Sequence, residues 1–262
     1  MVQSLVQHRS LVYQLTRRNV VGRYRGSLAG FAWSFVIPLL MLMVYTFVFG
    51  VVFQLRWAGG ERDTLDFAIL LFAGLILHQF LAECLTRSPA LITGNRQYVK
   101  RVVFPLEVLA WVTVCTALFH AAISMAVLVS FVLVVKQTFH WTLVLIPLIV
   151  LPLALIGAGL SWWLAATTVF VRDLSHLVGL AVTVLLFLSP IFYPVDALPA
   201  GLQPLLYLNP LTYPIEALRG AIFWGHVPDP GRIAAYYLIA FAMGWFGLFW
   251  FQRLRKGFAD VV

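Results

Sequence analysis

Charged residues are scarce in this chain. Asp, Glu, Lys and Arg make up 11% of its 262 residues, hydrophobic residues make up 62%, and the mean hydropathy is +0.93. A soluble globular domain carries about a quarter charged and about half apolar residues. The composition therefore excludes a soluble domain and predicts a single domain embedded in a lipid bilayer.

Motifs for catalysis and metal binding are missing as well. The two cysteines, Cys84 and Cys115, lack C-x-x-C spacing, so we expect neither a disulfide nor a metal site. The six histidines form no H-E-x-x-H, and no G-x-S-x-G occurs. His120 lies in an apolar tract, where an ionisable residue is a functional candidate, but we expect a neutral imidazole bonded to a neighbouring helix. The sequence thus predicts no enzymatic activity and no catalytic residue.

The chain also lacks the means to use nucleotide energy. A phosphate-binding loop needs G-x-x-x-x-G-K-[ST], whereas the three lysines are followed by Arg101, Gln137 and Gly257. A proton- or sodium-coupled carrier usually keeps carboxylates within its spans. Here Glu83 and Glu107 lie only at the inner ends of the expected spans. If this chain transports a substrate, a partner must supply the work.

Long neutral tracts are what the chain does have. They cover 26–55, 67–82, 108–135, 137–171, 174–195, 197–215 and 233–252. A helix needs about 20 apolar residues to cross a bilayer, but the tract 197–215 holds four prolines and is not expected to cross as one helix. We therefore predict an all-α integral membrane protein with six transmembrane helices, at about 31–54, 67–84, 106–135, 141–168, 174–192 and 233–251.

Positive charge is unequal on the two sides of these spans. Thirteen of the 18 Lys and Arg residues fall on the side of the N-terminus and five on the other. By the positive-inside rule, the first side and both termini are cytoplasmic, which predicts a multi-pass protein of the cytoplasmic (inner) membrane. Residues 1–25 are expected to form an amphipathic arm at the cytoplasmic interface. The minimal role of its cations is to orient the first span. These cations are Arg17, Arg18, Arg23 and Arg25.

The cytoplasmic loop after the second span is predicted to hold a short rigid helix. Ser88 can cap a helix that begins at Pro89, and Gly94 with Asn95 can end it. Such a helix transmits force from a partner better than a flexible loop does, although a lipid-facing basic loop is the alternative. The polar residues considered for this contact are Ser88, Arg96, Tyr98 and Lys100.

The proline-rich tract between the fifth and sixth spans is predicted to form a re-entrant outer hairpin at 193–225. Leu177 to Phe192 supply only 16 residues, about 24 Å of helix, so the fifth span is expected to end short of the outer surface. Backbone at that depth must be buried in protein or line a wet cavity. We expect helices near 196–206 and 213–224, a turn at Asn209-Pro210, and a Glu216–Arg219 pair. Such a hairpin can act as a gate at the outer end of the protein, and a simple packing plug is the alternative.

Four separated blocks of the sequence together resemble one known family. The blocks are RRNVVGRYRGSLAGFAWSFVIPLLMLMVYTFVFGVVF, GNRQYVKRVVFPLEVL, RDLSHLVGL with LFLSPIFYP, and LNPLTYPIEALRG. They are similar to the permease subunits of ABC-2 type polysaccharide exporters, which include O-antigen, capsule and teichoic acid transporters. The resemblance covers nearly the whole chain, and the blocks occur in the family's order.

The resemblance implies a homodimer that pairs with two copies of a separate cytoplasmic ATPase. ATP and Mg would be bound by that partner, with no cofactor on this chain and no nucleic acid involved. The implied cargo is a polysaccharide attached to a lipid carrier such as undecaprenyl diphosphate. By the same likeness, the loop around Ser88 to Lys100 would be a coupling helix, and Arg172 and Asp173 would make a second ATPase contact. The implied outer gate comprises Tyr193, Pro194, Tyr207, Asn209, Pro210, Tyr213, Glu216 and Arg219.

Two features of the residues agree with this implied cargo. The arginine fork suits phosphate oxygens, so the four arginines of the arm are candidates to recruit the lipid headgroup as well as to anchor the span. Aromatic side chains give flat apolar faces to sugar rings, and Tyr45, Phe49 and Phe53 are candidate channel-lining residues, with an interfacial aromatic belt as the alternative. Two other functions stay open: an ABC permease for a drug or small lipid, and a membrane enzyme or scaffold without transport.

Overall fold

A computed structural model describes residues 6–27, 29–52, 64–99, 104–137 and 139–258. This described part consists of helices, turns and connecting segments and contains no strand. Helices satisfy their own backbone hydrogen bonds, which a lipid environment requires. The all-α class that the apolar tracts predicted is confirmed.

The helical segments follow the apolar tracts closely. The α-helices are α2 (Arg9–Tyr24), α3 (Trp33–Tyr45), α4 (Thr64–Arg87), α5 (Ala90–Thr93), α6 (Arg96–Val99), α7 (Val108–Lys136), α8 (Ile146–Phe170), α9 (Leu174–Leu188), α10 (Gln203–Leu206), α11 (Thr212–Arg219) and α12 (Pro230–Leu254). The 3₁₀ turns are η1 (Gly30–Ala32), η3 (Trp141–Leu145), η4 (Val195–Ala197) and η6 (Arg255–Gly257), and the π-helical segments are η2 (Thr46–Val52) and η5 (Gly220–Trp224).

Five helical segments of the described chain are long and apolar enough to cross a membrane. They are Gly30–Phe49, Leu65–Arg87, Val108–Lys136, Trp141–Phe170 and Pro230–Gly257. Where we expected a span at 174–192, α9 has 15 residues, about 22 Å of helix, which is less than the roughly 30 Å hydrocarbon core. It ends at Leu188 because Ser189 precedes Pro190 and adopts an extended conformation.

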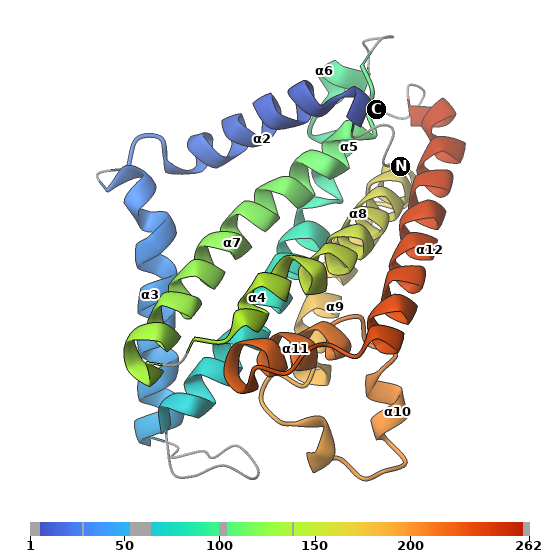
Figure 1. Ribbon diagram of the computed structural model, residues 1–262. Helices are drawn as coiled ribbons and strands as arrows, with labels where there is room; N and C mark the ends of the chain where they lie inside the picture. The colour runs from blue at the N-terminus through green and yellow to red at the C-terminus, as the bar shows by residue number, and fades with distance from the viewer. Residues whose placement is uncertain (1–5, 28, 53–63, 100–103, 138, 259–262) are drawn as a thin grey trace.

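The long helices form a bundle with α2 lying across one end of it (Figure 1). α4 packs between α7, α8 and α9, and α12 packs along α8. α2 rests on α7 through Val12, Leu15 and Val20, which are buried. Gly26 and Gly30, with φ of 86° and 50°, allow the chain to turn from α2 into η1 and α3.

The contact between α8 and α12 depends on small residues. A Cβ built on Gly159 would lie 2.8 Å from the carbonyl carbon of Met243, and one built on Gly247 would lie 2.6 Å from that of Gly159. The two backbones therefore touch, as small residues allow between membrane helices. Nearby, Trp162 is fully buried and donates its indole N–H to the Glu107 carbonyl at 2.9 Å, which ties α8 to the start of α7.

Candidate functional site

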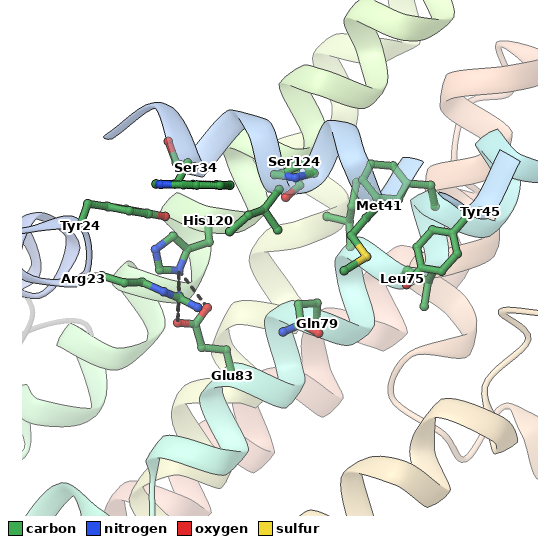
Figure 2. A pocket seen from close by; sticks show the side chains of 15 residues that line it. Arg23, Tyr24, Ser34, Met41, Tyr45, Leu75, Gln79, Glu83, His120 and Ser124 are labelled. Carbon is green, nitrogen blue, oxygen red and sulfur yellow. Dashed lines mark hydrogen bonds and ion pairs between the residues drawn. The ribbon is translucent and has the colours of Figure 1, made fainter. Parts of the chain in front are cut away.

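An elongated cavity of about 280 Å³ lies between α2, α3, α4 and α7 (Figure 2). Its lining along α4 changes from charged to apolar, from Glu83 through Gln79 to Phe72. These 11 positions correspond to about 16 Å of helix, so the charged end lies near the cytoplasmic end predicted for α4. The apolar walls are completed by Ile37, Met41, Tyr45, Leu75 and Ile76.

The charged end of the cavity is organised around one carboxylate. Glu83 has a side chain only 10% exposed, and its Oε1 lies 2.7 Å from Nη2 of Arg87 and 3.2 Å from Nη1 of Arg23. Its Oε2 lies 2.9 Å from Nδ1 of His120. Residues from α2, α4 and α7 therefore meet at a single buried anion, as Figure 2 shows for Arg23, Glu83 and His120.

Nδ1 of His120 lies between groups of both signs. It is 2.9 Å from Oε2 of Glu83, which accepts hydrogen bonds, and 3.2 Å from Nη1 of Arg23, which donates them. The other ring nitrogen, Nε2, is buried and has no hydrogen-bond partner among the described residues. The expectation that His120 bonds to a neighbouring helix is met, and its partner is a charged side chain.

A cavity of this kind can take an amphiphilic ligand. A cation at its charged end and apolar walls beyond it match an amphiphile with an anionic headgroup. Besides the charged cluster, the polar residues that line this cavity include Ser34, Gln79 and Ser124. Among the described residues, none of them forms a nucleophile–base pair there.

The four arginines of the arm are all exposed, and two of them contact other elements. Arg23 reaches Glu83, and Arg18 donates to the Tyr98 hydroxyl of α6 at 3.4 Å. Arg17 lies on the exposed side of α2, and Arg25 follows its end. On the arm itself Val12 is buried, whereas the neighbouring Tyr13 is exposed.

The predicted channel aromatics form a cluster with α4. The ring centroids of Tyr45 and Phe49 are 6.3 Å apart, and Phe49 lies 5.9 Å from Phe67 and 6.1 Å from Phe192. Tyr45 also lines the cavity. Phe53 lies outside the described residues.

The loop after α4 contains the short helix that the sequence predicted, but Ser88 does not cap it. α5 begins at Ala90 after Pro89, and the Ser88 hydroxyl instead donates to the Cys84 carbonyl in the last turn of α4. Ser88 is 0% exposed, so its side chain does not lie on the surface that a partner would meet. The capping prediction is wrong because a serine that ends a helix can bond back to the carbonyl four residues earlier.

Other predicted coupling residues do lie at the surface. Arg96 and Arg172 line a hollow of about 400 Å³ between α5, α8 and α9, together with Ser175. Asp173 is exposed immediately before α9. Tyr98 stacks on Phe104 with ring centroids 4.4 Å apart. Lys100 lies outside the described residues.

The outer tract 193–225 contains shorter helices than expected. The first expected helix, near 196–206, is broken into η4 and α10, and the second is α11 continued by η5 and ended by Gly225 at φ 67°. Tyr193 donates to the Phe187 carbonyl at 3.2 Å and Pro194 precedes η4. Asn209 donates to Ser189 Oγ at 2.9 Å and accepts from the Leu211 N–H, which forms the predicted turn.

The same tract is tied to α12 and to itself. The Pro210 carbonyl accepts from the Tyr236 hydroxyl at 2.7 Å, and the Tyr213 and Tyr236 rings are 5.3 Å apart. Glu216 accepts from the Tyr207 hydroxyl at 3.0 Å.

Arg219 makes contacts that the sequence did not predict. Its side chain is 3% exposed and donates to the backbone carbonyls of Leu70 at 2.8 Å, Pro190 at 2.6 Å and Ile191 at 2.8 Å. The proposed pairing with Glu216 missed these contacts because they come from residues 28 to 149 positions away. The guanidinium thus joins α11 to α4 and to the segment that follows α9.

Sequence reasoning missed the cluster around Glu83. It placed Glu83 at the inner end of a span and expected His120 to bond to a neighbouring helix, but it did not connect the two residues. The available signal was that the two ionisable residues belong to adjacent apolar tracts, near the arginine-rich arm. Nothing in the spacing of 37 residues between them shows that they are in contact.

Comparison with known proteins agrees with the resemblance noted in the sequence. An O-antigen export system permease protein RfbA of Myxococcus xanthus is 29% identical over 264 residues, covering 100% of this chain and 99% of that protein. Two proteins of the same name from Klebsiella pneumoniae are each 27% identical over 254 and 253 residues, with 96% of this chain and 95% of each relative covered. The family described as ABC-2 type transporter matches residues 10–223. The chain belongs to the ABC-2 type transporter family.

Proposed function

We propose that this chain is the permease subunit of an ABC transporter that exports O-antigen, carried on a lipid, across the cytoplasmic membrane. The observation that carries the proposal is similarity over essentially the whole chain to proteins named O-antigen export system permease. The apolar helices, the absence of a P-loop in the sequence and the cavity with a cationic mouth support the same conclusion. ATP hydrolysis is assigned to two copies of a partner ATPase, and the permease to a homodimer.

The proposed topology has six crossings and cytoplasmic termini. α9 supplies the fifth crossing together with the hairpin at 193–225, which completes the depth that a 15-residue helix does not cover. The cation distribution supports this orientation. α2 then lies at the cytoplasmic interface, where its exposed arginines meet lipid headgroups.

The roles of the two ends follow from this topology. Arg96, Arg172 and Asp173 lie on the cytoplasmic surface, where we assign them to ATPase contact. The outer hairpin is assigned to a gate that parts as the glycan leaves. Cysteine labelling from outside, scanned from Tyr193 to Arg219, should change when the ATPase is trapped with nucleotide, whereas uniform labelling would point to a static loop.

Deletion of the gene tests the proposed function. We expect lipid-linked O-antigen to accumulate on the cytoplasmic side and to disappear from the cell surface, with both effects reversed by the wild-type gene. Normal surface O-antigen in the deletion strain would reject the proposal. It would favour an ABC permease for a drug or small lipid, a function with which the modest cavity of about 280 Å³ is also compatible.

A further inference from the structure

The three groups that contact Glu83 are not held equally. Arg87 is on the same helix and approaches to 2.7 Å, and His120 is 17% exposed and approaches to 2.9 Å. Arg23 belongs to the crossing arm, is more exposed than Arg87 (50% against 37%), and its Nη1 lies 3.2 Å from both Oε1 of Glu83 and Nδ1 of His120. Exposed, monodentate ion pairs contribute little to stability. Arg23 is therefore the partner that exchanges most readily.

The position of Arg23 gives this exchange a consequence. Arg23 is half-exposed and lines the charged end of the cavity between α2, α3, α4 and α7, so an anionic headgroup at that end would approach the same guanidinium that Glu83 holds. Arg23 and Arg87 carry two positive charges against the single negative charge of Glu83. The cluster can therefore accept one further anion, and Glu83 and the ligand compete for Arg23.

We propose that Glu83 is an internal competitor for the anionic headgroup of a lipid, holding Arg23 against α4 and yielding it when a phosphate-bearing amphiphile enters the cavity. Occupancy then loosens the polar link between arm α2 and α4. Because α4 leads through Ser88 and Pro89 directly into α5, the change occurs one turn of helix from the loop assigned to the ATPase. The inference rests on the proposed function for the identity of the cargo, whereas the competition itself is independent of export.

The test measures equilibrium binding of radiolabelled geranylgeranyl diphosphate to the purified permease in phosphatidylcholine nanodiscs. Glu83→Gln keeps the shape of the side chain and an acceptor for His120 but removes the competing charge. We expect this variant to bind the probe about three- to fivefold more tightly, the range expected for one exposed ion pair. Arg23→Gln should bind it more weakly, and geranylgeraniol, which lacks the anion, should not distinguish the variants.

A double variant and a charge-matched control make the test specific. If Glu83 acts through Arg23, the gain from Glu83→Gln must vanish in the Arg23→Gln background. Asp229→Asn removes the same charge from an exposed N-cap that does not line the cavity, and because asparagine caps a helix as well as aspartate does, it should leave the affinity within about twofold. Equal or weaker binding by a Glu83→Gln protein with a normal unfolding temperature would overturn the proposal, as would a gain that persists without Arg23.

Two sources of the anionic lipid are separated by a change of bilayer. Phosphatidylglycerol added to the nanodiscs should leave probe binding unchanged if the site takes the exported lipid, and should displace the probe if it takes bulk phospholipid. Either result is consistent with competition by Glu83. Tighter binding by Glu83→Gln in a protein whose deletion leaves surface O-antigen intact would reject the proposed export function alone.

Discussion

Replacement of Gly247 by alanine is expected to force α8 and α12 apart. The new Cβ would lie 2.6 Å from the carbonyl carbon and 2.7 Å from the Cα of Gly159, where ordinary contact begins at 3.4 Å. The obstructing atoms are backbone, which a rotamer change cannot move. The helices must therefore separate by about 1 Å along a contact whose stability comes from close packing.

The size of the effect follows from two opposing contributions. Overpacking typically costs about 1–3 kcal/mol, and the upper end applies because backbone must shift. Alanine regains about 1 kcal/mol of helix propensity relative to glycine. The net loss of about 2 kcal/mol corresponds to a fall of about 4–8 °C in the unfolding temperature of a chain of roughly this size.

Exposure of Cys84 provides the assay. Its side chain is 0% exposed, so a thiol-reactive dye in a Cys115→Ser background reports unfolding on heating. Gly179→Ala on α9 is the control, because no atom lies within 4 Å of its added Cβ, and it should melt at or slightly above the wild-type temperature. The reasoning is refuted if Gly247→Ala and Gly179→Ala melt within about 1 °C of each other.

Three further predictions concern Arg219, the surface assigned to ATPase contact, and the arginines of the arm. Arg219→Lys should destabilise the protein by about 2 kcal/mol or more in the same assay. The reason is that a compact ammonium cannot reproduce the three hydrogen bonds of the guanidinium to the carbonyls of Leu70, Pro190 and Ile191. An unfolding temperature equal to that of the wild type would contradict this. Arg96→Cys and Arg172→Cys should each crosslink to the ATPase in an assembled complex, whereas Ser88→Cys should not, because Ser88 is buried. Crosslinking by Ser88→Cys alone would contradict the surface assignment. Export should fall when the arm's arginines are replaced by glutamine while reporter fusions show unchanged topology, and normal export would leave them only an anchoring role. Those arginines are Arg17, Arg18, Arg23 and Arg25.

Much of the fold could be predicted from local properties of the sequence. The length of a neutral tract is a property of the tract itself, so the five long apolar helices were foreseeable. The predicted span at 174–192 ran through Pro190, whereas α9 ends before it at Leu188. The absence of a P-loop is likewise local. The short helix at Ala90–Thr93 and the turn at Asn209 depend on neighbouring residues and were predicted for the same reason.

The tertiary structure alone decided which polar groups meet. Glu83 contacts His120 and Arg23 across 37 and 60 residues, and the helix bundle rather than any motif brings them to one cavity. Arg219 satisfies carbonyls of α4 and of the segment after α9, although Glu216 stands three positions away. Burying a polar group without a partner costs free energy, and the choice of partner depends on how the helices pack, which residue spacing does not specify.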